Sequence, residues 1–169
     1  GDVSFMQLRG TELPYVDNLV NLLVVDDPGK IAEDEMMRVV APLGVILVRK
    51  EGEWLKTVKP WPEEIDEWSH YLHDSDNNAV STDSVVHKPR ALQWMADPLH
   101  GRSHEELAGV SALVTSRGRV FYIADYAPPA FIRFDSEWKL VARDAFNGVL
   151  LWTKEIPRWS DHLRHFRAG

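Results

Sequence analysis

The feature that most constrains the fold is a series of short apolar segments in the second half of the chain. Turn residues separate these segments, most clearly at residues 116–119 and 144–148. Several short strands joined by turns are typical of a sandwich, a barrel or a propeller. The sequence therefore predicts an all-β second half, with strands at residues 92–95, 110–115, 120–124, 138–143 and 149–155.

The first half has a different pattern. Residues 20–25 form an almost continuous aliphatic run between turn signals, which predicts a strand buried on both faces, as in a parallel sheet. Residues 32–40 predict a short helix with acidic residues in its first turn, where they suit the helix dipole. A second aliphatic strand is expected at residues 45–48. Strand, helix and strand would form one unit with a right-handed crossover.

These patterns together predict an α+β fold that is mostly β. We expect an α/β segment at residues 1–50, a charged and proline-containing linker at 51–66, and a β region at 67–169. Residues 3–8 have the character of a short strand, and residues 65–73 that of one or two helical turns.

Composition limits the partners. The net charge is −7, and an acidic chain repels phosphate backbones, so we expect no nucleic-acid partner. No apolar run reaches the ~18 residues of a membrane span. The chain has no Cys, which excludes disulfides and thiolate metal ligands but does not identify a compartment.

One turn motif carries most information. Ala142, Asp144, Gly148 and Trp152 occupy a spacing that resembles the repeat of quinoprotein-type β-propellers, Ala-x-Asp-x-x-Thr-Gly-x-x-x-Trp. Asn147 stands where the family has Thr. Asp144 is expected to accept backbone N–H bonds across the turn, and Asn147 and Gly148 to supply positive φ angles. Trp152 would pack between neighbouring blades.

This resemblance covers residues 66–156 and is closest to the propeller proteins of planctomycete-like bacteria. A propeller has about four to eight four-stranded blades, and the chain has strands for about one. We therefore expect the chain to be a piece of a larger protein. The resemblance implies a periplasmic or secreted location. Some relatives bind pyrroloquinoline quinone with Ca²⁺, but none of the residues that would hold this cofactor can be assigned here.

Two further stretches resemble the second half of a class I methyltransferase domain. They are Leu-Pro-Tyr-Val-Asp-Asn at residues 13–18 and Arg-Val-Val-Ala-Pro-Leu-Gly at residues 38–44. The glycine-rich loop that holds S-adenosylmethionine has no counterpart in this sequence. We therefore expect this segment to be structural and to bind no cofactor.

Histidines provide the candidate metal ligands. On a helix, His70 and His73 would share a face at i, i+3 spacing, with Asp74 beside them. His100 and His104 lie in a second polar segment. The main hypothesis is a structural or binding segment of a propeller protein. The alternative is a small metal-dependent hydrolase or oxidoreductase that holds a divalent metal with these residues.

Two kinds of partner remain open. Strands at the edge of an incomplete sheet can pair between copies, which predicts a homo-oligomer. The seven Trp residues suit either core packing or stacking against a carbohydrate or another small-molecule ligand.

Overall fold

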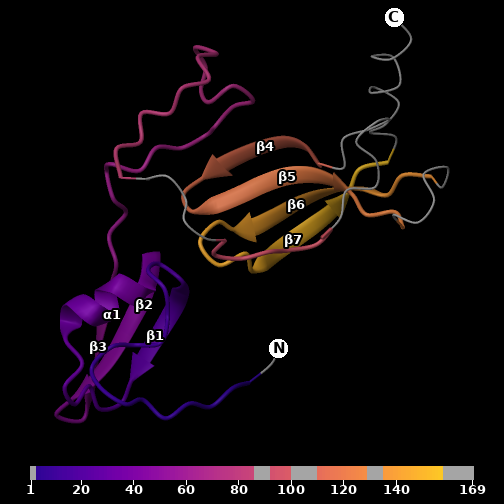
Figure 1. The fold of residues 1–169 in the computed structure, drawn as a ribbon. Coiled ribbons are helices and arrows are strands. Elements are labelled where there is room, and N and C mark those ends of the chain that lie inside the picture. The colour runs from indigo at the N-terminus through magenta and orange to yellow at the C-terminus, as the bar shows by residue number, and fades with distance from the viewer. Residues whose placement is uncertain (1–2, 86–91, 100–109, 129–134, 158–169) are drawn as a thin grey trace, which may run out of the picture. The chain divides into compact units, whose positions relative to one another are not determined.

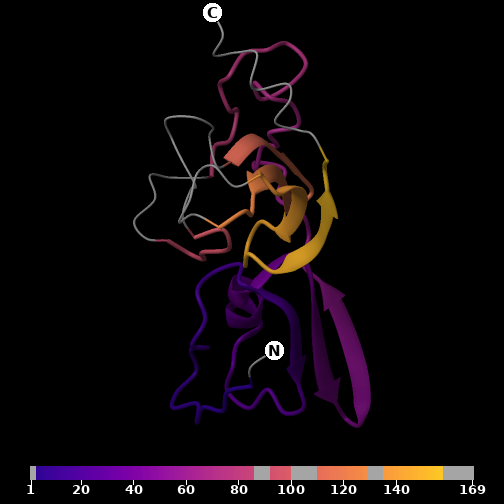
Figure 2. The ribbon, with the colours of Figure 1, turned by 90° about the vertical axis from the view of Figure 1, so that its right-hand side faces the viewer.

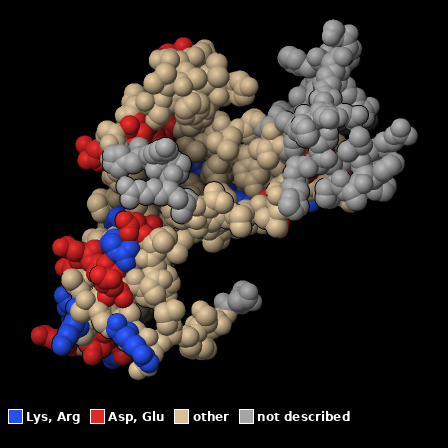
Figure 3. All heavy atoms as spheres, viewed as in Figure 1, with Lys and Arg blue, Asp and Glu red and all other residues tan. Residues whose placement is uncertain are grey.

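The structure is a computed structural model that describes residues 3–85, 92–99, 110–128 and 135–157. The chain divides into two compact units, Gly1–Glu63 and Glu64–Gly169 (Figure 1). Within the described ranges, no helix has the length and apolarity needed to cross a membrane. On the visible face of the N-terminal unit, Lys and Arg interleave with Asp and Glu, so neither sign forms a large patch there (Figure 3).

The N-terminal unit is a three-stranded sheet with one helix. Its elements are β1 (Val20–Val25), α1 (Glu33–Val39), β2 (Val40–Lys50) and β3 (Glu53–Val58). The strand order is β1-β2-β3, with β1 and β2 parallel and β2 and β3 antiparallel (Figure 2). The expected strand, helix and parallel strand are therefore confirmed.

Only one face of this sheet is covered within the unit. Met36 and Val39 of α1 pack with Val25, Val40 and Ile46 to form the core. Two β1 side chains, Leu22 and Val24, are 56% and 54% exposed. The expectation that β1 is buried on both faces was wrong, because one short helix covers a single face.

Part of the expected linker is a strand. Glu53–Val58 forms β3 and pairs with β2 through Val58 opposite Val45 and Glu53 opposite Lys50. The reversal lies at Glu51 and Gly52, both with positive φ. The segment Glu-Trp-Leu-Lys-Thr-Val has no regular alternation of polar and apolar residues, and the strand is exposed along most of its length, so the sequence pattern did not indicate it.

Arg38 joins the two methyltransferase-like stretches. Its guanidinium donates to Glu35 Oε1 and Oε2 at 2.7 Å each and to Asp17 Oδ1 at 2.6 Å. It also donates to the carbonyls of Leu13 and Tyr15. The hydrogen bond from Arg38, followed by that from the Leu13 backbone, lowers the pKa of Glu35 to about 2. These bonds fasten the loop before β1 to α1.

The C-terminal unit contains a four-stranded antiparallel sheet. Its strands are β4 (Val110–Ser116), β5 (Arg119–Asp125), β6 (Trp138–Asp144) and β7 (Leu150–Glu155), paired in chain order. The expectation of short antiparallel strands is confirmed for these four. Three other expected elements are wrong: residues 3–8 and 92–95 form no strand, and residues 65–73 form no helix.

The two faces of this sheet differ in how they are packed. On one face, Val120, Tyr122, Ala124 and Val141 form a buried cluster, against which Trp94, Tyr126 and Ala145 pack. The opposite face carries Val114, Phe121, Ala142 and Trp152, which oppose one another across the four strands. Strand β7 is exposed along its whole length.

Candidate functional site: the Asp66 and His73 network and the Asp144 turn

A polar loop is attached to the outer edge of β4. The N–H of Thr115 donates to the carbonyl of Trp68 at 2.7 Å, and the N–H of Trp68 donates to Thr115 Oγ1 at 2.8 Å. The carboxylate of Glu67 accepts from the N–H of Arg117. The segment that carries both described His residues, His70 and His73, is therefore bonded to the edge of the sheet.

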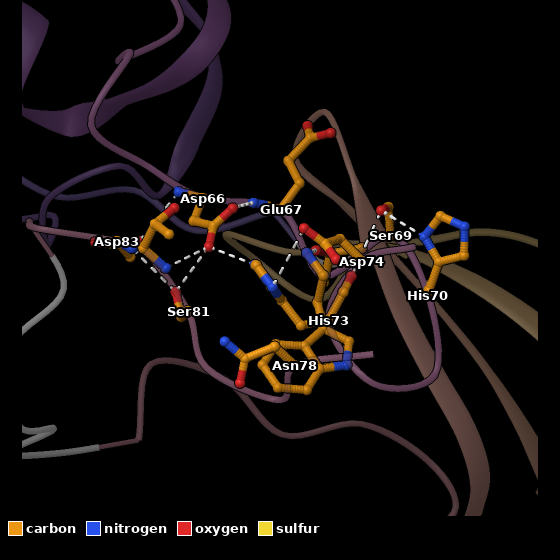
Figure 4. A network of polar contacts seen from close by, with 12 residues as sticks. Asp66, Glu67, Ser69, His70, His73, Asp74, Asn78, Ser81 and Asp83 are labelled. Atoms are coloured by element: carbon orange, nitrogen blue, oxygen red, sulfur yellow. Dashed lines mark hydrogen bonds and ion pairs between the residues drawn. The ribbon is translucent and has the colours of Figure 1, made fainter. Parts of the chain in front are cut away.

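Asp66 is the centre of this loop (Figure 4). Its Oδ2 accepts from the N–H of Thr82 at 2.6 Å and from Ser81 Oγ at 3.1 Å. The same oxygen lies 2.6 Å from Nε2 of His73. The Thr82 N–H is the largest cause that holds the pKa of Asp66 well below its usual range, and His73 adds to it against the opposing effect of burial. Asp66 is thus an ionised carboxylate that closes the loop.

The His73 side chain is enclosed. It is 6% exposed, and its ring lies edge-on to Trp68 with centroids 5.3 Å apart. Since a carboxylate only accepts, Nε2 of His73 must carry the proton that bonds to Asp66. Nδ1 lies 3.8 Å from Oδ2 of Asp74. His73 therefore has a carboxylate near each ring nitrogen.

His70 and His73 do not share a helical face. They form an isolated antiparallel bridge, with the His70 N–H donating to the His73 carbonyl, and His73 has a φ of +73°. In a helix the N–H of a later residue donates to the carbonyl of an earlier one, whereas here the earlier His70 donates to the later His73, so the expected helix does not form. His70 is exposed, and its Nδ1 lies 2.9 Å from Ser69 Oγ.

The predicted metal ligands are not brought together in the described part of the chain. There, no three His, Asp or Glu side chains are grouped to hold a metal ion. His73 bonds to Asp66, and Asp74 accepts from the N–H of Asp76 at 2.7 Å. The other two predicted ligands, His100 and His104, lie outside the described residues.

The propeller-like motif forms the turn between β6 and β7. Oδ1 of Asp144 accepts from the N–H groups of Phe146 and Asn147 at 2.8 and 3.2 Å, as expected. Gly148 has a φ of +72°. Asn147 is absent from the residues with positive φ, so that part of the expectation was wrong. Asn147 instead accepts from the N–H of Val149 through its side chain at 3.1 Å.

Trp94 covers this turn. Its Nε1 donates to the carbonyl of Ala145 at 2.9 Å, and its ring lies against Gly148. Ala142 of the motif is fully buried, whereas Trp152 is 44% exposed and lies 6.1 Å from Phe121 between ring centroids. The sequence predicted a strand at Trp94 and gave no sign of its contact with Gly148.

A buried arginine beside the turn was missed. Nε of Arg143 donates to the hydroxyl of Tyr122 at 2.9 Å, and Nη1 donates to the carbonyl of Gly148 at 2.9 Å. The hydroxyls of Tyr122 and Tyr126 both donate to the carbonyl of Asp97. The bonds among Asp97, Tyr122, Tyr126 and Arg143 join residues 21 to 46 positions apart, so no local spacing could have indicated them.

Comparison with known proteins gives no family assignment. No protein-family model matches the chain, and neither curated proteins nor solved structures contain a significant match.

Replacing Asp66 should change the acid stability of the C-terminal unit. The folded pKa of Asp66 is depressed, so its contribution is present above the unfolded value of about 4 and is lost as pH falls below it. We expect the unfolding free energy of Asp66→Asn to be lower than that of the parent at pH 5. This difference in unfolding free energy should become smaller toward pH 2. Urea unfolding curves across this pH range measure it.

Asp135→Asn is the matched control, because Asp135 is an exposed carboxylate of the same unit. If the difference in unfolding free energy between Asp66→Asn and the parent stays constant from pH 5 to pH 2, the ionised Asp66 carboxylate does not stabilise the unit.

Proposed function

We propose that residues 64–157 act as a structural and binding segment, one blade of a quinoprotein-like propeller. The observation that carries the proposal is the four-stranded antiparallel sheet β4-β5-β6-β7, closed at its last turn by Asp144 and Gly148. Propeller blades are four-stranded sheets of this kind. In this function the sheet packs face to face against a neighbouring sheet.

The packing face is the one that carries Phe121 and Trp152. Trp152 is nearly half exposed and Phe121 is half-buried, although both lie beside the fully buried Ala142. A Trp or Phe side chain has about 150–250 Å² to bury, and its burial is a main source of interface energy. A second sheet against this face would remove both rings from water.

The N-terminal unit supports a related proposal. A sheet with parallel strands is normally covered on both faces. Here Leu22 and Val24 remain exposed on the face away from α1. We propose that this unit corresponds to the second half of a methyltransferase-like domain and has a structural role.

No residue of the described part of the chain can be assigned to a quinone cofactor or Ca²⁺. The carboxylates of Asp66, Asp125 and Asp144 already accept backbone N–H bonds, and Arg143 bonds to Tyr122 and to a backbone carbonyl. For the alternative of a metal-dependent enzyme, one predicted ligand, His73, already bonds to Asp66. The proposal therefore concerns packing and binding alone.

A chain with a second copy of residues 64–157 after residue 169 tests the packing. If the two sheets stack, the C-terminal unit should gain about 2 kcal/mol of unfolding free energy, as expected for burial of a large apolar side chain. Urea unfolding measures the gain in stability. The fluorescence of bound anilinonaphthalene sulfonate, divided by the number of sheets in the chain, measures the apolar surface that remains exposed.

The control is Phe121→Gln, carried in both the single and the doubled chain, which should abolish the gain. If the doubled chain unfolds at the same urea concentration as the single chain and binds the same amount of dye per sheet, face-to-face stacking is refuted.

A further inference from the structure

We propose that β7 pairs with β7 of a second copy of this chain, antiparallel and about a two-fold axis at Thr153. The two four-stranded sheets would then join edge to edge into one continuous sheet. This inference concerns the edge of the sheet, whereas the proposed function concerns its face, and the two share the side chain of Trp152.

Strand β7 is an exposed edge of the sheet, with a regular ladder from Trp152 to Glu155. Within the described part of the sheet it is the last strand and pairs with β6 on one side. Leu150 and Leu151 are 49% and 43% exposed, and all six residues of the strand are exposed. Edge strands of natural proteins usually carry bulges, prolines or charges that hinder pairing. Strand β7 has one register shift, at Leu151, and two charges of opposite sign, Lys154 and Glu155, whereas Trp152 and Thr153 lie on the regular part of the ladder.

The hydrogen-bond ladder shows which backbone groups are available. The N–H of Ile156 donates to the carbonyl of Trp138 at 2.9 Å. Backbone groups of an antiparallel strand point to alternate sides. With Leu140 opposite Lys154 and Ala142 opposite Trp152, these two β7 residues bond to β6. The N–H and C=O of Thr153 and Glu155 therefore point away from the sheet and can bond to another strand.

Symmetric pairing through these two residues allows three registers. A two-fold axis at Glu155 sets two carboxylates opposite each other, and an axis at Lys154 does the same with two ammonium groups. Like charges directly opposite one another destabilise a strand pair. The axis at Thr153 avoids both conflicts.

The Thr153 register also creates a favourable contact twice. It sets Lys154 of each copy opposite Trp152 of the other, at a non-hydrogen-bonded position where side chains approach most closely. An ammonium over an indole ring is the strongest of the common cation–π pairs. The charge of Lys154 and the exposed ring of Trp152 thus select a second copy as the partner of this edge.

A single cysteine tests both the pairing and its register. The chain has no Cys, so Thr153→Cys introduces a unique thiol. At the two-fold axis the two Cα atoms would lie about 5.5 Å apart, within the ~4.4–6.8 Å range of disulfides. We expect a covalent dimer after mild oxidation, seen on a non-reducing gel.

Leu150→Cys is the matched control. In the proposed register Leu150 opposes Ile156, so two Cys at position 150 would lie about 20 Å apart and would not crosslink. A Leu150→Cys chain that crosslinks as readily as Thr153→Cys, or a Thr153→Cys chain that stays monomeric, overturns the proposal.

Sedimentation velocity of the full chain gives an independent test. Thr153→Pro removes an N–H that points outward, so it should leave the β6–β7 ladder intact and weaken dimerisation at least tenfold. Far-ultraviolet circular dichroism, unchanged in this variant, verifies that the sheet persists. Lys154→Glu should also weaken the dimer, since it replaces the cation opposite Trp152. A parent chain that sediments as a monomer at the highest concentration reached refutes the pairing.

Discussion

Gly148→Ala should remove about 3 kcal/mol of unfolding free energy from the C-terminal unit. A Cβ atom at position 148 would lie 2.6 Å from two ring atoms of Trp94. The φ of +72° adds strain of about 1 kcal/mol for any residue with a side chain. Trp94 cannot withdraw freely, because its indole N–H is bonded to the carbonyl of Ala145. Urea unfolding followed by near-ultraviolet circular dichroism measures the loss.

The same substitution in a Trp94→Ala chain separates the two causes. Without the ring, only the backbone strain of about 1 kcal/mol should remain. Gly52→Ala gives a second reference, since Gly52 has a φ of +88° and open space around it. A cost of Gly148→Ala that is the same with and without Trp94 would contradict the steric explanation.

Lys59→Met should destabilise the N-terminal unit by about 3 kcal/mol. The ammonium of Lys59 donates to Asn18 Oδ1 at 2.6 Å and to the carbonyls of Met37 and Val40 at 2.6 and 2.8 Å. Burial lowers the pKa of Lys59 against the opposing charge of Asp17. Methionine matches the length of lysine but leaves three acceptors without their donor.

Lys56→Met is the matched control, because Lys56 lies in β3, three residues before Lys59, and has an exposed side chain. Its effect should stay within about 0.5 kcal/mol. Chemical unfolding of both variants, followed by hydrogen exchange of β2 amides, makes the comparison. Equal losses for the two lysines would show that the three bonds of Lys59 add no stability.

The strands of the C-terminal unit were predictable because their information is local. Alternating and aliphatic segments mark β4 to β7, and Asp144 with Gly148 marks a tight turn. The apolar segments and the turn motif each depend on residues close together in sequence, and the structure contains the four strands and the turn. In the N-terminal unit, the aliphatic runs predicted β1 and β2, and the acidic first turn predicted α1.

The errors occur where distant residues decide the conformation. Trp94 was expected in a strand, but its packing on a turn more than 50 residues later fixes it as an irregular segment. His70 and His73 have helical spacing, yet they form a bridge, and the His73 side chain bonds to Asp66, seven residues earlier. Lys59 looked like one more charge in a linker, and only the fold shows its three acceptors. No single-sequence pattern records contacts of this kind.

The bonds between Trp68 and Thr115 limit how many copies of the chain can join through their sheet edges. Because the N–H of Thr115 is already bonded to the Trp68 carbonyl, the outer side of β4 is blocked at that position. A sheet with two open sides can add copies at both and grow into a fibre, whereas a sheet with one open side stops at a closed pair. The loop that carries Asp66 and His73 therefore hinders the pairing of a further copy with β4, and assembly through β7 should end at two copies.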